Sequence, residues 1–145
     1  MEHQDVAVLS IATRPDCLQD DVLDLLSDLN KKKPVWIELG LQTIHKNIAE
    51  YIRRGYDLSV YDKAVSYLRS RNIEVITHVI LGLPGETKED MKETVKYVCE
   101  SGATGIKLQL LHVLKGTDLL KDYDAGKFDV LSEDEYIEID RKSVV

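Results

Sequence analysis

A carboxylate and an amide stand inside an otherwise apolar stretch, Val35 to Thr43, which reads VWIELGLQT. Alternate side chains of a β-strand share a face, so Glu38 and Gln42 lie with Trp36 on one face and the aliphatic residues lie on the other. Burying a glutamate is costly unless the carboxylate is paired, protonated or bound by a ligand. The pattern predicts that Glu38 and Gln42 face an enclosed polar space. The candidate partners of Glu38 are Arg14, His78, Lys107 and a bound ligand.

A second stretch, Glu74 to Asp90 (EVITHVILGLPGETKED), combines a buried strand, a glycine turn and a helix start. Its apolar run is nearly continuous, which is typical of a strand buried on both faces. Glycine accepts positive φ and proline pre-sets φ, so Gly82, Pro84 and Gly85 end the strand. Thr87 and Asp90 then form a capping-box pattern. The segment is either an ordinary strand-to-helix turn or a loop that presents backbone N–H groups to a ligand.

Polar residues also fall in or after the other apolar strands. In parallel α/β folds the loops after the strands gather at one edge of the sheet, where ligands bind. Each residue also has a structural explanation: Arg14 can pair with Asp16, a strand histidine is often a satisfied core residue, and Lys107 can extend outward to solvent. The candidate site residues outside the Glu38 strand are Arg14, His78, Gly82, Leu83, Pro84, Gly85, Lys107, Gln109 and His112.

The apolar pattern alternates between period two and period 3.6, which predicts strands and helices in turn. Strands are predicted at Val6–Thr13, Val35–Thr43, Glu74–Leu83 and Gly105–Leu114. Helices are predicted from Asp20 to about Lys32, from a Ser59 cap to about Asn72, from Lys88 to about Ser101, and from Ser132 onward, with 44–57 irregular. The predicted buried helix residues are Tyr61, Ala64, Val65, Leu68, Met91, Val95, Val98 and Cys99. Such alternation implies parallel strands joined by right-handed crossovers.

The composition limits the class of protein. The chain has 145 residues, of which 43% are hydrophobic and 31% charged, as expected for one globular domain with a core. The net charge of −7 argues against a general nucleic-acid surface, and the basic clusters Lys31–Lys33 and Arg53–Arg54 are interpreted as solvated. No apolar run reaches the roughly 18 residues of a membrane span, so we expect a cytoplasmic protein without a membrane partner.

Five short motifs follow one another along the chain: TRPDC at 13–17, ELGLQT at 38–43, RGYD at 54–57, HVILGLPGE at 78–86 and GIKLQLLH at 105–112. As a set they resemble the second half of the YhcC-like radical SAM proteins, which are related to the catalytic subunit of Elongator. The resemblance extends to about Ile139. It implies that residues 1–139 are a partial radical SAM core domain, strands three to six. Residues 140–145 (DRKSVV) read as the in-frame translation of a common sequencing adapter, so we expect them to be a non-native tail.

The resemblance implies an α/β fold, an incomplete radical SAM (βα)6 TIM-like barrel with about four parallel strands and crossover helices. Its cofactors would be S-adenosylmethionine and a [4Fe-4S] cluster, which together generate a 5′-deoxyadenosyl radical that abstracts hydrogen from a substrate. Glu38 and Gln42 match polar positions that line the adenosylmethionine site, and the 82–86 loop matches the segment that holds the adenine. Arg14, His78, Lys107, Gln109 and His112 match positions near the cofactor or substrate.

The sequence departs from the family pattern at the cluster. The family's CxxxCxxC motif is absent, and Cys17 and Cys99 are too far apart to replace it. The first two βα units of the family barrel are also absent. Tyr56 and Gln109 stand where relatives commonly carry histidine, which leaves the roles of these two positions open. We therefore expect a fragment of a radical SAM enzyme that does not assemble the cluster by itself and whose substrate the sequence does not name.

Two other functions remain open from the sequence. A lysine directed into an α/β barrel can form Schiff bases, so Lys107 is the candidate of a lyase or aldolase-type barrel. A half-barrel would also leave the strands at Val6 and Gly105 with unpaired edges. Such edges favour a non-catalytic role by self-association, with a homodimer as the expected assembly.

Overall fold

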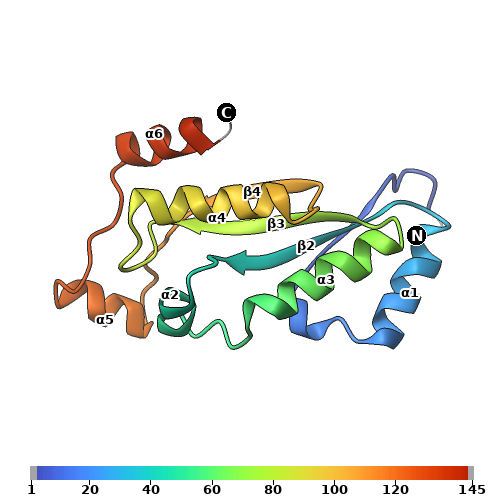
Figure 1. Cartoon of the computed structure of the whole chain (residues 1–145), viewed down its shortest axis with the longest axis horizontal. Helices are drawn as coiled ribbons and strands as arrows, with labels where there is room; N and C mark the ends of the chain where they lie inside the picture. The colour runs from blue at the N-terminus through green and yellow to red at the C-terminus, as the bar shows by residue number, and fades with distance from the viewer. Residues whose placement is uncertain (1–2, 144–145) are drawn as a thin grey trace.

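Four parallel strands form one sheet in the order β1-β2-β3-β4 (Figure 1). The computed structural model describes residues 3–143. The strands are β1 (Leu9–Thr13), β2 (Val35–Gln42), β3 (Glu74–Leu81) and β4 (Gly105–Leu110). Each strand pairs with its successor in the chain, as expected for successive right-handed βα units. The predicted fold class, an α/β fold with four parallel strands and crossover helices, is confirmed.

Long helices connect the strands and cover one side of the sheet (Figure 1). They are α1 (Asp20–Asn30), α3 (Leu58–Ser70) and α4 (Lys88–Glu100). A 3-10 turn (Pro15–Cys17) follows β1, and the shorter helices α2 (Lys46–Tyr51) and α5 (Asp118–Asp124) follow β2 and β4. The last helix is α6 (Glu133–Ser143), whose first turn is capped reciprocally by Ser132 and Glu135.

The core lies between the sheet and these helices. The aliphatic face of β2 is fully buried: Val35, Ile37, Leu39 and Leu41 each have 0% relative exposure. Burial of each such side chain contributes about 1.5–3 kcal/mol. Tyr61 of α3 is also fully buried, and its hydroxyl lies 2.8 Å from Thr77 Oγ1 of β3, so these two buried polar groups are paired with each other. The stripes predicted for α3 and α4 are buried, except for Cys99, which is exposed.

The other face of the sheet carries the polar side chains. Along β2, Trp36 is 40% exposed and Glu38, Gly40 and Gln42 are half-buried. The face assignment made from the period of the sequence is therefore confirmed. The same face of β3 and β4 carries His78 and the exposed side chains of Lys107 and Gln109. The sheet is thus apolar on its helical side and polar on the side that a barrel would enclose.

Several predicted boundaries differ from the structure. β1 starts at Leu9 because its partner β2 starts at Val35, just after Pro34, and β4 ends at Leu110 because β3 stops before Gly82. The segment 44–57, predicted to be irregular, contains α2. The prediction that Ser59 caps α3 is wrong, because Asp57 occupies the N-cap position and makes no side-chain capping bond.

The carboxyl-terminal residues continue a helix. Residues 140–143 of the expected non-native tail belong to α6, and 144–145 lie outside the described residues, so their origin stays a prediction. No helix in the described part of the chain is both long and apolar enough to cross a bilayer.

Candidate functional site

Glu38 is the centre of a polar network on the open face of the sheet. Its Oε1 accepts a hydrogen bond from Ser10 Oγ at 2.8 Å. Its Oε2 accepts one from His78 Nε2 at 2.6 Å and one from Lys107 Nζ at 3.2 Å. These donors belong to all three other strands, so the carboxylate joins the whole sheet. Two of the partners predicted for Glu38, His78 and Lys107, are confirmed.

The network keeps Glu38 ionised. Hydrogen bonds from Ser10, His78 and Lys107 favour the charged form and lower the pKa of Glu38 from 4.5 to about 2. The side chain is 20% exposed, and the Lys107 side chain is 53% exposed. The open face therefore carries a fixed acceptor beside a cation that solvent or a ligand can reach.

Arg14 does not reach Glu38. Its guanidinium instead forms a two-point ion pair with Asp16, with Nε to Oδ1 at 2.9 Å and Nη2 to Oδ2 at 2.7 Å. A partner two residues away places little restriction on the chain, so the local pair forms in place of a contact with the next strand. Arg14 also lies over the Tyr56 ring, 5.3 Å from its centroid.

The RGYD motif fixes the end of β2. The interpretation of Arg53–Arg54 as a solvated cluster is wrong for Arg54, whose side chain is buried. Its Nη1 donates to the carbonyls of Leu41 and Thr43 at 3.2 and 2.6 Å, which gives the buried guanidinium hydrogen-bond partners. The Tyr56 hydroxyl donates to the Gly40 carbonyl, and the Tyr56 ring lies 4.7 Å from the Arg54 guanidinium. Sequence reasoning did not assign these roles, although it singled out RGYD as one of the five motifs of the resemblance.

The backbone is distorted at Gln42, the last residue of β2. Its φ is +70°, a left-handed value that a residue other than glycine adopts at a cost, and the ladder with β3 shifts register between Gly40 and Gln42. A Cβ on Gly40 would lie 2.7 Å from Gln42 Nε2, so glycine leaves room for the amide to fold back over the strand. The Oε1 of Gln42 is buried and has no hydrogen-bond partner.

The GLPGE turn after β3 has one covered and one open glycine. Gly82 (φ +82°) lies against Leu131, whose side-chain atoms would be 2.9 Å from an added Cβ. Gly85 (φ +83°) would meet nothing within 4 Å, and Leu83 is buried. The open part of the turn is therefore Pro84–Gly85. The predicted Thr87–Asp90 capping box is confirmed at the start of α4.

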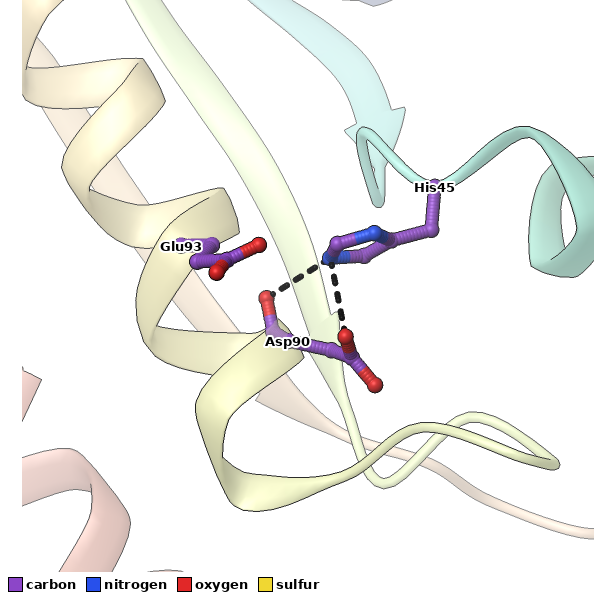
Figure 2. A group of neighbouring side chains, drawn as sticks. All are labelled: His45, Asp90 and Glu93. Atoms are coloured by element: carbon purple, nitrogen blue, oxygen red, sulfur yellow. Dashed lines mark hydrogen bonds and ion pairs between the residues drawn. The ribbon is translucent and has the colours of Figure 1, made fainter.

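A group of possible metal ligands lies beside this turn, formed by His45, Asp90 and Glu93 (Figure 2). Their ligand atoms all lie within 4.8 Å of one another. His45 Nε2, however, already donates to the backbone carbonyl of Asp90 at 3.0 Å, and Asp90 Oδ2 already accepts hydrogen bonds from the N–H and the hydroxyl of Thr87. The positive end of the α4 dipole also disfavours a cation. The group serves better as a tether between two loops than as a metal site.

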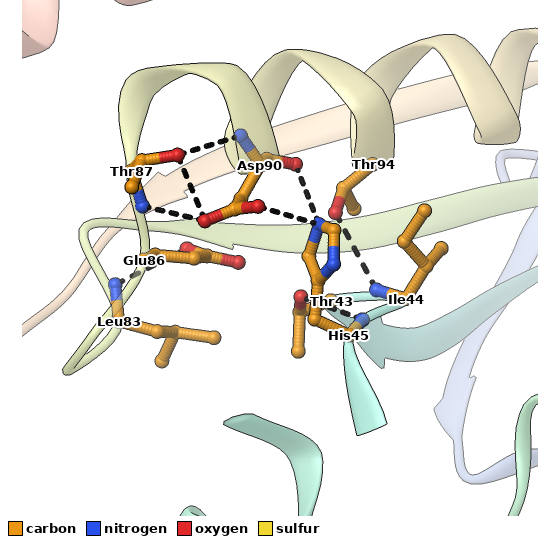
Figure 3. A network of polar contacts seen from close by, with 8 residues as sticks. All are labelled: Thr43, Ile44, His45, Leu83, Glu86, Thr87, Asp90 and Thr94. Carbon is orange, nitrogen blue, oxygen red and sulfur yellow. Dashed lines mark hydrogen bonds and ion pairs between the residues drawn. The ribbon is translucent and has the colours of Figure 1, made fainter. Parts of the chain in front are cut away.

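Other bonds complete this tether (Figure 3). The Ile44 N–H donates to Thr94 Oγ1 at 3.4 Å, and the Leu83 N–H donates to Glu86 Oε2 at 3.3 Å. Burial raises the pKa of Glu86 to about 7, despite a hydrogen bond from Thr43 that favours the charged form. Glu86 Oε1 is buried without a hydrogen-bond partner. The tether fixes the GLPGE turn relative to the end of β2.

Apart from Gly82, Pro84 and Gly85 of the GLPGE turn, the predicted site residues fall in three neighbouring places. Glu38, His78 and Lys107 form the network on the open face. Arg14, Gln42 and Leu83 line a hollow of about 340 Å³ at the carboxyl ends of the strands. Gln109 and His112 line a separate hollow of about 490 Å³, with Tyr136 of α6. Ile80 of β3 lines both hollows, so the two are adjacent.

The chain belongs to the radical SAM superfamily, whose family profile matches residues 1–98. The profile of the radical SAM C-terminal domain matches residues 103–142. Together with the parallel sheet, these matches confirm the predicted family and fold.

Individual relatives agree with this assignment. YtqA of Bacillus subtilis is 48% identical over 135 residues, which cover 93% of this chain and 42% of YtqA. YhcC of Escherichia coli is 39% identical over 137 residues, covering 94% of this chain and 44% of YhcC. The structure of archaeal Elp3 from Methanocaldococcus infernus matches with a TM-score of 0.85 and 26% identity, over 94% of this chain and 32% of that one. The chain thus spans less than half the length of these relatives.

The family implies S-adenosylmethionine and a [4Fe-4S] cluster, and the residues fit these two groups differently. The open polar face and the hollow at the strand ends suit a polar organic ligand, since the unpartnered Gln42 Oε1 lies in the side chain that lines the hollow. The cluster needs several cysteine thiolates together. Cys17 follows β1 and Cys99 lies near the end of α4, both as exposed free thiols. The described residues therefore do not form a cluster site.

Proposed function

We propose that this chain forms one wall of the S-adenosylmethionine site of a radical SAM enzyme. The proposal is supported most strongly by the position of the Glu38 network, which lies on the open face of a sheet that superimposes on Elp3 with a TM-score of 0.85. The bound group would supply reductive cleavage of its sulfonium at a [4Fe-4S] cluster, which starts hydrogen abstraction from a substrate. The cluster ligands would come from residues other than those of this chain.

The residues of the chain would hold and orient the ligand. Glu38, whose pKa is lowered to about 2 and which is therefore ionised near neutral pH, offers acceptor oxygens, and Lys107 beside it offers a donor. Gln42 lines the hollow at the strand ends, and the Pro84–Gly85 turn leaves its backbone accessible. Arg14, His78, Gln109 and His112 complete the surface around these groups.

Trp36 provides a direct test of binding. It is the only tryptophan of the chain, it is 40% exposed, and it lies two residues from Glu38 on the same face. We expect S-adenosylmethionine to change Trp36 fluorescence with a saturable dependence on concentration. Glu38→Gln should weaken this binding, and the control Glu100→Gln, on the helical side of the sheet, should leave it unchanged. The proposal fails if no saturable change occurs, or if both variants behave like the unaltered chain.

One observation supports self-association as a second function. β1 and β4 are the outer strands of the open sheet, as the sequence led us to expect. Unpaired strand edges favour pairing with another chain. The Schiff-base alternative has weaker support. Nucleophilic lysines lie in an apolar pocket or beside another cation, whereas the Lys107 side chain is 53% exposed and donates to the Glu38 carboxylate.

A further inference from the structure

A partition of three side chains separates the hollow at the strand ends from a second hollow on its outer side. The outer hollow, of about 380 Å³, is lined by residues of α2 and α5. Ile52, Arg53 and Leu119 line both hollows. Figure 1 shows α5 beside α2, beyond the arrowheads of β2 and β3. Because Leu119 belongs to α5, a movement of this helix would open the hollow at the strand ends toward solvent.

Helix α5 is attached to the body of the protein by surface contacts. None of its residues is buried. The Tyr51 hydroxyl donates to Asp122 Oδ2 at 2.6 Å, and Arg53 Nη2 lies 3.0 Å from Asp118 Oδ2. The Arg53 and Asp118 side chains are 77% and 56% exposed, and exposed pairs of this kind contribute little to stability. The helix can therefore leave α2 without uncovering the core of the protein.

The segment that carries α5 is held together by its own contacts. The Thr117 side chain caps the first turn of the helix. Lys127 Nζ lies 2.7 Å from Asp122 Oδ1, and the rings of Tyr123 and Phe128 lie 5.7 Å apart. These contacts all join residues within the segment, so we expect α5 and the residues after it to move as one body.

Glycines flank α5 on both sides. Gly116 has φ +82° and Gly126 has φ +67°, and a Cβ added to either would meet nothing within 4 Å. Glycine changes its backbone conformation at low steric cost, and no neighbouring group restricts these two. Farther out, the Leu111 N–H donates to a carbonyl of β3 at 3.1 Å, and Leu131 contacts the GLPGE turn. The segment is thus anchored at both ends and can turn between them.

Apolar side chains on this segment are left uncovered. Of the eight large apolar side chains that are exposed in the described part of the chain, three belong to it: Leu114, Tyr123 and Val130. Burial of these groups therefore does not hold α5 in place. Leu111 and Leu119, by contrast, line the hollow at the strand ends, where a ligand would contact them. Such a contact removes apolar surface from water, so a bound ligand would favour the closed position of α5.

We propose that residues 111–130 form a strap that opens and closes the hollow at the strand ends. Helix α5 is the moving part, Gly116 and Gly126 are the hinges, and the contacts with Tyr51 and Arg53 hold the strap closed. The identity of the ligand rests on the proposed function above, but the movement of the strap does not. The strap controls how fast a ligand enters and leaves the hollow.

Hydrogen exchange of the unliganded chain tests the movement. We expect the N–H groups of α5 to exchange at least about tenfold faster than those of α4, because α4 opens only together with the core. Tyr51→Phe removes the hydrogen bond to Asp122 and should accelerate exchange in α5 about two- to fivefold. Tyr67→Phe, which changes an exposed tyrosine of α3, is the control. Equal exchange in α5 and α4, or the same exchange rate of α5 in both variants, would overturn the proposal.

A cross-link tests the control of access. In a Cys17→Ala/Cys99→Ala background, Tyr51→Cys and Asp122→Cys can be joined by a short bismaleimide, which fixes α5 to α2. We expect S-adenosylmethionine to change Trp36 fluorescence about tenfold more slowly in the cross-linked chain than in the same variant before cross-linking. Equal rates would show that the strap does not control entry.

The two experiments separate this proposal from the proposed function. If S-adenosylmethionine leaves Trp36 unchanged in every variant while Tyr51→Phe accelerates exchange in α5, the proposed function fails and the strap stands. If S-adenosylmethionine binds at the same rate with and without the cross-link, or if Tyr51→Phe leaves exchange unchanged, the strap fails and the proposed function is unaffected.

Discussion

Glu38 Oε2 lies 2.6 Å from His78 Nε2, a contact that bridges β2 and β3 on the open face of the sheet. The same oxygen accepts from Lys107 of β4, and the other oxygen accepts from Ser10 of β1. One carboxylate thus fixes the spacing of four strands on the side where no helix packs. It also combines a structural role with the chemistry of the proposed site.

The first prediction concerns acid stability. The pKa of Glu38 in the folded state is about 2, below its ordinary 4.5, so ionised Glu38 stabilises the fold above pH 4.5. That contribution should decline as the pH falls from 4.5 toward 2. Urea unfolding across this range should show a smaller loss of stability for Glu38→Gln than for the unaltered chain. Parallel pH profiles for the two proteins would contradict the assignment.

Glu86 should act in the opposite direction. Its folded pKa of about 7 lies above the ordinary 4.5, so the protonated form is favoured in the fold. The contribution of protonated Glu86 to the stability of the fold is complete below pH 4.5 and is lost as the pH rises through 7. Glu86→Gln should therefore gain stability relative to the unaltered chain between pH 5 and pH 8, as measured by thermal unfolding. A constant difference between the two proteins would show that Glu86 does not titrate in this range.

The two glycines of the GLPGE turn form a matched pair. Both have positive φ, but only Gly82 lies against another side chain, that of Leu131. Alanine at either position should cost about 1 kcal/mol for the backbone, and Gly82→Ala should cost a further 1–3 kcal/mol for the overlap with Leu131. Adding Leu131→Ala to Gly82→Ala should recover part of this difference in chemical denaturation. Equal losses for the two glycine variants would rule out the Leu131 contact.

Cluster assembly should fail in this chain. Anaerobic reconstitution with iron and sulfide should leave it without visible charge-transfer absorption, because Cys17 and Cys99 lie apart on the surface. A Cys17→Ala/Cys99→Ala variant is the control for adventitious iron. Stoichiometric, cysteine-dependent cluster uptake would overturn the view that other residues hold the cluster.

The exposed edges of β1 and β4 predict self-association. Light scattering over a range of protein concentrations should show dimers or larger species. Ala12→Lys, at an exposed position of β1, places a charge on an outer strand and should shift the equilibrium toward monomer. A monomer at all concentrations would exclude this behaviour.

The sequence predicted the sheet, its open face and the helix stripes, because these follow from periods of two and 3.6 that extend over whole elements. Helix α2 was missed because Lys46–Tyr51 is too short to show a period. Arg14 pairs with Asp16 and not with Glu38, and this outcome depends on the local turn after β1. The roles of Arg54 and Tyr56 were missed because backbone carbonyls are their partners, and any sequence supplies such carbonyls.

The contact between the Leu131 side chain and Gly82 couples the end of the chain to the GLPGE turn. Leu131 lies two residues before α6, so the final helix and the GLPGE turn cannot shift independently. A ligand that changes the conformation of the turn must therefore disturb the Leu131–Gly82 contact. If this lowers or raises the affinity of α6 for a partner, the partner changes the affinity of the turn for the ligand by the same factor.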